Sequence, residues 1–178
     1  EKAIKLEKDA LAQIENITAD NARLVSNLHA NLGGLYRMNG HPDLAREHME
    51  KSISLLDQFN LLHINDSIPQ IANYAMFLTE QQEPERGISE LQKLSGIIKE
   101  YHSDDCLDYA KVQETLGTIY LMTANLSQAK THFKRAFKIY EKIWADEPEM
   151  IEAKYREIQE LYPQIGFSIG KTLSGLLT

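Results

Sequence analysis

The sequence predicts an all-α fold, a right-handed superhelical stack of antiparallel helix hairpins (an α-solenoid). The pattern Leu-Gly-x-x-Tyr at residues 32–36 returns at residues 116–120, twice 42 residues later. A divergent copy that keeps the residue sizes, Tyr-Ala-x-x-Leu, lies midway at residues 74–78. Pro42 and Pro84 are also 42 residues apart. A fixed period of this size is typical of repeat arrays, whose units bury their apolar faces against one another.

Residues 1–17 are expected to form one helix, from Lys2 to about Asn16. Ala3 lies 42 residues before Ala45. This helix is therefore interpreted as the second helix of a truncated repeat, and we expect the chain to be part of a longer protein. The apolar residues that recur here at helical spacing are Ala3, Ile4, Leu6, Ala10, Leu11 and Ile14.

Three full repeats are predicted next, each a pair of antiparallel helices. Pro42 and Pro84 suit the first position of a second helix, where the missing N–H would have no intrahelical partner. Asn39 and Gly40 are a usual C-terminal pair for a first helix. The repeats are expected at 22–61 (helices 22–38 and 42–60), 64–102 (helices 64–81 and 84–101) and 105–146 (helices 105–123 and 127–145).

Residues 148–178 are expected to form a partial repeat and a closing helix. Pro148 opens the partial repeat, and Pro163 ends its helix. Beyond Pro163 the 42-residue pattern fails, because Lys171 stands where a small residue is needed. An apolar closing helix over 164–178 is predicted to cover the last exposed face, as terminal repeats must. The whole chain, 1–178, is thus predicted to be a single domain.

Small residues recur at two places in each repeat and are assigned a structural role rather than a catalytic one. A missing or minimal side chain lets one helix axis settle against its neighbour. The positions are Gly33, Ala75 and Gly117 on the first helices, and Ala45, Gly87 and Ala129 on the second helices.

Charge and composition limit the classes of partner. The net charge of −7 disfavours broad attraction to nucleic acid or to a membrane, although a local basic patch is not excluded. The single cysteine, Cys106, cannot form an intramolecular disulfide, and no apolar run approaches the length of a membrane span. We therefore expect a cytoplasmic protein.

The repeated residues resemble the tetratricopeptide repeat (TPR), although neither of the better copies has the Trp of that pattern. The usual repeat has about 34 residues, so a 42-residue period adds about one turn to each helix. Repeats of this length are similar to those of kinesin light chains, bacterial peptide-pheromone regulators and the sensor arms of multidomain bacterial regulators. The residues that carry the resemblance are His29, Leu32, Gly33, Tyr36, Ala45 and Met49 in one copy, and Gln113, Leu116, Gly117, Tyr120, Ala129 and Phe133 in another.

The resemblance implies that the first helices line a concave groove that holds an extended peptide or a partner helix. Asn31 and Asn73 are 42 residues apart, with Thr115 at the third equivalent place. A ladder of carboxamides, each both donor and acceptor, suits the backbone of an extended peptide. The alternative is that these side chains are solvated or bonded to a neighbouring helix. The candidate groove residues are Asn27, Asn31, Arg37, Asn73, Met76, Lys111, Thr115 and Arg156.

The cations Arg37, Lys111 and Arg156 suit an acidic ligand or a terminal carboxylate. Glu114 and Glu160 lie nearby in the sequence, however, and intrahelical pairing with them is the favoured interpretation. Met76, for its part, suits an adaptable apolar floor, but core packing explains it equally well.

No catalytic, cofactor-binding or metal-binding residue is expected. The segment 166–172 has three residues between its glycines where a phosphate-binding loop needs four. The six histidines show no metal-site spacing, and His48 and His132, twice 42 residues apart, indicate a repeat-surface role. Cys106 lies among acidic residues that disfavour a thiolate, so it is interpreted as an inert residue at a helix start.

Two functions are weighed. The first is a noncatalytic protein- or peptide-binding module, part of a larger regulatory or scaffold protein and independent of any cofactor. The alternative is an oligomerisation or intramolecular docking module of a multidomain bacterial signalling protein. Fold alone does not decide between them.

Overall fold

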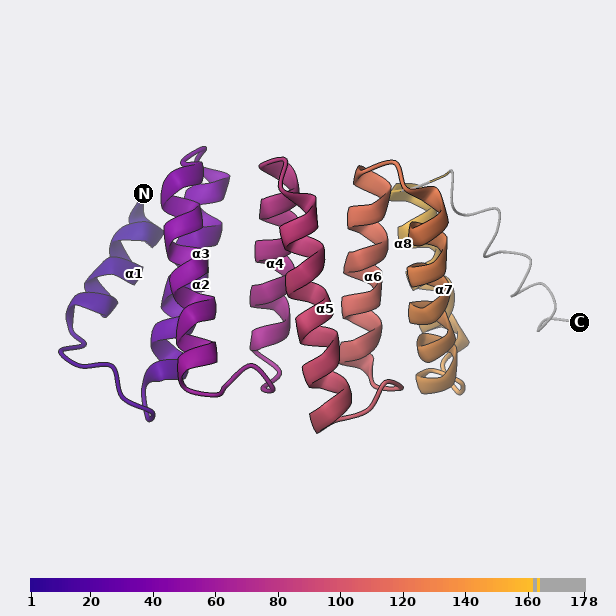
Figure 1. The fold of residues 1–178 in the computed structure, drawn as a ribbon, viewed down its shortest axis with the longest axis horizontal. Coiled ribbons are helices and arrows are strands. Elements are labelled where there is room, and N and C mark those ends of the chain that lie inside the picture. Colours follow the sequence, from indigo (N-terminus) through magenta and orange to yellow (C-terminus); the bar gives the residue numbers. More distant parts are fainter. Residues whose placement is uncertain (162, 164–178) are drawn as a thin grey trace, which may run out of the picture. The chain divides into compact units, whose positions relative to one another are not determined.

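The computed structural model describes residues 1–161 and Pro163, and all regular structure in this part of the chain is α-helix (Figure 1). The predicted all-α fold is confirmed, whereas the closing helix expected at 164–178 lies outside the described residues. No helix within residues 1–161 combines the length and the apolar character that a membrane span requires. The helices are α1 (Lys2–Ala12), α2 (Ala22–Met38), α3 (Pro42–Gln58), α4 (Ser67–Glu80), α5 (Pro84–Tyr101), α6 (Leu107–Met122), α7 (Leu126–Ile143) and α8 (Pro148–Leu161).

Several helix ends differ from the predicted bounds, and three of these differences have a clear local reason. α1 ends four residues early, because the N–H groups of Gln13 and Ile14 bond three residues back and tighten its last turn. α4 begins at Ser67, whose hydroxyl donates to the carbonyls of Leu62 and Ile64 and holds the preceding residues in a turn. α6 begins after Cys106, whose Sγ accepts from the Tyr109 N–H at 3.4 Å as an N-cap.

The turn from first to second helix has the same backbone geometry in all three full repeats. Gly40, Gln82 and Ala124, each 42 residues from the next, have φ of 74°, 66° and 59°. The residue after each one donates its N–H to a carbonyl five residues back, which is the hydrogen bond of a Schellman motif. The repeated pattern thus includes one residue in the left-handed conformation, and among the three turns this residue is glycine only in the first.

Contacts between residues divide the chain into two compact units, Glu1–Ile97 and Ile98–Thr178, and each is described by itself. The single domain 1–178 and the repeat boundaries within it stay predictions.

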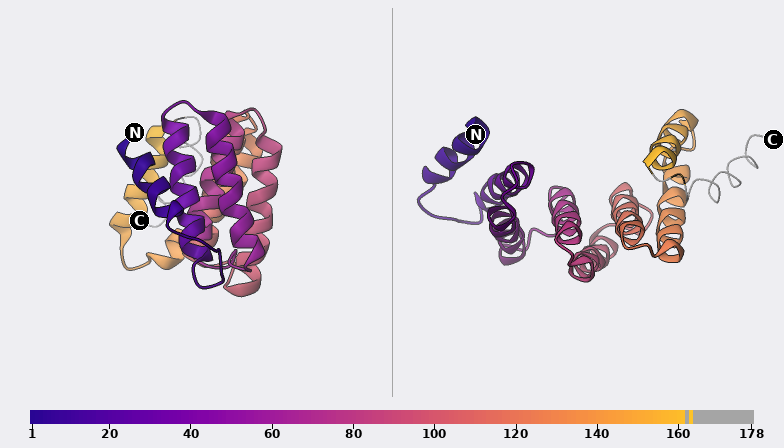
Figure 2. Two further views of the ribbon diagram at one scale, coloured as in Figure 1. Left: turned by 90° about the vertical axis from the view of Figure 1, so that its left-hand side faces the viewer. Right: turned by 90° about the horizontal axis from the view of Figure 1, so that it is seen from above.

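In the first unit, α2 and α3 form an antiparallel hairpin, and α1 packs against α2 (Figure 2). Gly33 allows close approach within the hairpin, since a Cβ there would lie 2.5 Å from Met49 Cγ. Gly87 does the same between α5 and α4, where a Cβ would lie 2.6 Å from the Ala75 carbonyl oxygen. The buried core around these contacts is Leu32, Tyr36, Ala45, Met49, Tyr74, Phe77 and Leu78.

In the second unit, α6 and α7 form the equivalent hairpin, and α8 packs on α7. A Cβ at Gly117 would lie 2.9 Å from the Phe133 ring, so Phe133 fills the place that Met49 fills in the first hairpin. Phe137 reaches α8 and meets the Tyr155 ring edge-on at 5.2 Å. The repeat therefore preserves the close contact and changes the side chain that makes it.

Candidate functional site

Two ion pairs fasten α2 to α4, one at each end. Arg23 donates from Nε to Asp66 Oδ2 at 2.6 Å, at the start of both helices. Arg37 donates through Nε (2.8 Å) and Nη2 to the two oxygens of Glu80, at the end of both helices. Because each pair joins the same end of the two helices, α2 and α4 run parallel. Both pairs span 43 residues, one more than the repeat period.

A buried polar network joins α2, α3 and α4 between those ion pairs. Gln70 Oε1 accepts from the hydroxyls of Ser26 (2.8 Å) and Ser52 (2.5 Å). Gln70 Nε2 in turn donates to Asn27 Oδ1 at 2.5 Å. Since buried polar groups need partners, these bonds fix which way the Gln70 amide faces. Asn27, predicted to line the groove, thus also links two helices.

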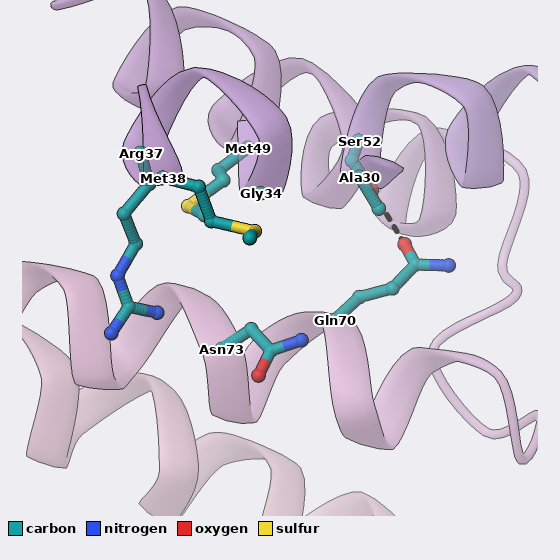
Figure 3. Close-up of a pocket in the computed structure, with 8 residues that line it drawn as sticks. All are labelled: Ala30, Gly34, Arg37, Met38, Met49, Ser52, Gln70 and Asn73. Atoms are coloured by element: carbon teal, nitrogen blue, oxygen red, sulfur yellow. Dashed lines mark hydrogen bonds between the residues drawn. The ribbon is translucent and has the colours of Figure 1, made fainter. Parts of the chain in front are cut away.

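Two adjoining hollows lie between α2 and α4, and we call them together the α2–α4 groove. Ala30, Gln70 and Asn73 line both hollows. The first, about 180 Å³, is shown in Figure 3 and is completed by Gly34, Arg37, Met38, Met49 and Ser52. The second is completed by Asn27, Asn31, Asp66 and Pro69.

The two predicted ladder residues differ in their hydrogen bonding. Asn31 donates from Nδ2 to Glu7 Oε1 on α1 at 3.1 Å. Asn73 is exposed, and its carboxamide has no hydrogen-bond partner within the described part of the chain. Figure 3 shows Asn73 on α4, across the first hollow from Gly34 and Met38 of α2. Asn73 therefore offers both of its amide N–H groups and its acceptor, whereas Asn31 keeps one amide N–H and its acceptor.

The three predicted cations are each paired with a carboxylate. Arg37 is held by Glu80, as described. Lys111 lies 3.7 Å from Asp108, and Arg156 lies 4.0 Å from Glu152, each on the same helix. Intrahelical pairing of Lys111 and Arg156 is thus confirmed, but the predicted partners Glu114 and Glu160 are wrong.

Glu114 is instead engaged by residues of α7 and α8. It accepts from the Tyr140 hydroxyl at 2.6 Å and lies 2.8 Å from Lys154 Nζ. These contacts cross between helices, and the intrahelical spacing rule therefore did not anticipate them.

The remaining candidates are not brought to the α2–α4 groove. Met76 is half-buried on α4 but does not line either hollow. Thr115 donates its hydroxyl to the Lys111 carbonyl at 3.0 Å, within α6. Lys111, Thr115 and Arg156 belong to the second unit.

The repeated histidines brace the hairpins, and the predicted repeat-surface role is wrong for His132, which is buried, while His48 is half-buried. His48 stacks on Tyr36, with ring centroids 5.4 Å apart, and bonds His29. His132, 8% exposed, stacks in the same way on Tyr120 at 5.2 Å. Burial lowers the pKa of His48 and of His132. Each of these two histidines lies 12 residues after the tyrosine of its repeat, and this common spacing is the sequence signal for the contact.

The polar network around Gln70 was also missed by sequence reasoning. Ser26, Ser52 and Gln70 are all buried. Ser52 lies 42 residues after Ala10, at a position that the repeat register assigns to the core. A polar residue at a core position was the sequence signal for this network.

Comparison with known proteins bears on the fold. The family described as Tetratricopeptide repeat matches residues 67–142. The crystal structure of BtubC (BKLC) from P. vanneervenii is similar with a TM-score of 0.74 and 19% sequence identity, over 93% of this chain. The chain spans 66% of the length of that protein. No curated protein matches the chain. At this identity, the structural likeness concerns the fold alone.

Proposed function

We propose, since this chain is a repeat protein of the tetratricopeptide type, that it is a noncatalytic module which binds an extended peptide or protein segment in the α2–α4 groove. The resemblance to that type of repeat is confirmed, and such repeats are generally protein-interaction modules. The finer likeness to kinesin light chains and bacterial peptide sensors stays a prediction.

The free carboxamide of Asn73 is the observation that carries this proposal. An extended backbone presents alternating N–H and C=O groups, and one carboxamide can pair with both. Asn73 lines both hollows, so a segment lying along the groove passes it. These contacts involve the backbone of the ligand, and they therefore tolerate many sequences.

The groove also offers apolar contact beside Asn73. Met38 is 84% exposed at the end of α2, and its flexible thioether suits varied side chains. Gly34 leaves room next to it, because a Cβ there would meet nothing within 4 Å. An apolar side chain of the ligand would find its place here.

The pairing of Arg37 favours a ligand that is contacted through its neutral backbone over a ligand that places a carboxylate here. Its guanidinium is bound by both oxygens of Glu80. A ligand carboxylate would have to displace Glu80, which already satisfies the fork geometry of Arg37. We assign Arg37 to shaping the groove rather than to binding charge.

The wider setting is part of the same proposal. We place the module in a larger regulatory or scaffold protein, in the cytoplasm, where the single free thiol of Cys106 would stay reduced. It would act without a cofactor, and neither nucleic acid nor a membrane would be the ligand of the groove.

Selection of peptides tests the proposal. A phage-displayed library of random, unstructured peptides is selected on the whole chain, and the affinity of each winner is measured for Asn73→Ala. The matched control is Gln92→Ala, which removes an exposed carboxamide from α5. Loss of two hydrogen bonds of about 0.5–1.5 kcal/mol each weakens binding by about 5-fold to 150-fold. Winners that bind Asn73→Ala and the wild type equally would overturn the proposal.

Self-association is the competing function, and α1 gives it a physical basis. No residue of α1 is fully buried, and Leu6 is 70% exposed. Sedimentation velocity over a range of concentrations separates the two functions. A monomer at every concentration supports the peptide-binding module. A dimer that Leu6→Lys dissociates supports self-association.

A further inference from the structure

The outer face of α7 concentrates positive charge in an acidic chain. α7 carries five Lys or Arg residues and one carboxylate, Glu141, so its net charge is +4. Since the whole chain carries −7, the remainder carries −11. Local and overall charge are therefore opposite in sign here.

Helical spacing places these cations on the side of α7 that faces away from the core. Lys134, Arg135 and Lys138 are exposed, and Lys130 is half-buried one turn before Lys134. We call these four residues the α7 basic face. The opposite side of the helix is buried, with Ala129, Phe133, Ala136, Phe137 and Tyr140.

Within the described part of the chain the α7 basic face forms no ion pair, although Asp105 attracts Lys138 over a longer distance. No carboxylate among residues 1–161 lies within 4.0 Å of its four cations. Lys142, at the end of α7, differs because it is paired with Asp105. The other five arginines of the chain all have a carboxylate within that distance, namely Arg23, Arg37, Arg46, Arg86 and Arg156.

Leaving these cations unpaired has a cost. Lys130, Lys134 and Lys138 stand at successive i, i+4 positions, where like charges destabilise a helix. Carboxylates of a partner would relieve that repulsion between the lysines. This relief favours binding in addition to the direct attraction between opposite charges.

We propose that the α7 basic face docks an acidic protein segment. A helix of 18 residues is about 27 Å long, which suits a short segment with regularly spaced carboxylates. The partner is chemically distinct from the neutral backbone proposed for the α2–α4 groove, and the two sites share no residue.

Charge and polarity favour a protein segment over other anions. A nucleic acid duplex would extend beyond α7 and meet the −11 of the rest of the chain, while charge screening at physiological salt confines the attraction to about 8 Å. Membrane binding by a surface helix needs apolar side chains beside the cations. On α7 the exposed large apolar residues are Leu126 and Ile143, at its two ends.

The probe for the test is a fluorescent peptide as long as α7, with Glu at every fourth position in an Ala-Gln background. Its binding to the whole chain is followed by fluorescence anisotropy. The test variant is Lys134→Glu/Arg135→Glu/Lys138→Glu. The control is Lys2→Glu/Lys5→Glu/Lys51→Glu, which changes the net charge equally at exposed lysines elsewhere. A second test variant, Lys134→Gln/Arg135→Gln/Lys138→Gln, removes the charge with good helix formers, and circular dichroism verifies its fold.

The proposal expects both α7 variants to weaken binding of the probe by about tenfold or more, and the control to weaken it by less than about threefold. Equal loss in the α7 and control variants would overturn it, since only overall charge would then matter. It would also be overturned by a DNA duplex, or by vesicles with anionic lipid, that binds α7 more tightly than the probe does. Asn73→Ala leaves probe binding unchanged, so failure here is separate from failure of the groove.

Discussion

The Nδ1 atoms of His29 and His48 lie 2.9 Å apart, and this hydrogen bond joins α2 to α3. In the second unit the equivalent pair is Gln113 and His132, again at 2.9 Å. A pair of histidines makes such a bond only while at least one ring nitrogen is unprotonated, whereas glutamine accepts at any pH. One hairpin contact is thus built in two chemistries: protonation of both histidines breaks the bond in the first pair, whereas the Gln113 acceptor of the second pair persists in acid.

We predict that the first hairpin loses stability as pH falls. Burial, with smaller contributions from His48 and Lys51, lowers the pKa of His29 to about 4, although Glu47 opposes this shift. Burial also lowers the pKa of His48, with Lys8 acting in the same direction and Glu47 against it. Because the folded pKa lies below the unfolded value of about 6.5, the unfolded chain takes up protons first. The stabilisation is complete above about pH 6.5 and is lost as pH falls toward about 4.

Urea denaturation at several pH values between about 7.5 and 5 measures this effect, above the range where most carboxylates titrate. His29→Gln, which copies Gln113, should keep the hydrogen bond and flatten the pH dependence of the unfolding free energy. A decline as steep as that of the wild type would show that this pair is not its source.

Gly87→Ala should destabilise the protein, and Gly34→Ala should stabilise it. The Cβ at Gly87 would lie 2.6 Å from the Ala75 carbonyl oxygen, a backbone atom that cannot move freely, so a cost of about 1–3 kcal/mol is expected. At Gly34 a Cβ meets nothing, so only the gain in helix propensity remains, about 0.5–1 kcal/mol. Thermal denaturation of the two variants checks the sign. Equal effects would contradict the close approach of α4 and α5.

Ala124→Gly should stabilise the turn between α6 and α7. Ala124 has φ of 59°, the left-handed conformation that costs a residue with a Cβ about 1–2 kcal/mol. Gly40 occupies the equivalent place in the first repeat without this cost. The gain should be about 1 kcal/mol by urea denaturation, reduced by the greater freedom of glycine in the unfolded chain. Destabilisation would mean that the turn does not hold this conformation.

The sequence predicted most of the fold because the repeat is local and periodic. Leu32, Tyr36 and Pro42 each recur with their neighbours at fixed spacing, and packing against the next helix follows from that spacing. The bounds of α2 and α5 agree with the predicted ranges for the same reason. The start of α4 differs from the predicted one, because it depends on which carbonyls the Ser67 hydroxyl reaches.

The site was less predictable, because its hydrogen bonds join residues that no short-range rule pairs. Asn31 and Asn73 look equivalent in the sequence, yet Glu7, 24 residues before Asn31, engages only one of them. Likewise the 43-residue offset of Arg37 and Glu80 follows from how α2 and α4 lie side by side. Repeat register gives the face of a helix on which a residue lies, but tertiary packing decides whether its side chain is free.

The side-chain NH₂ signal of Asn73 tests the central claim most directly. Nitrogen-15 spectra of the chain are recorded while a selected peptide is added. The account predicts that the Asn73 signal shifts until the protein is saturated, while that of Gln92, on α5, stays in place. An Asn73 signal that does not move at saturation would contradict the α2–α4 groove as the binding site.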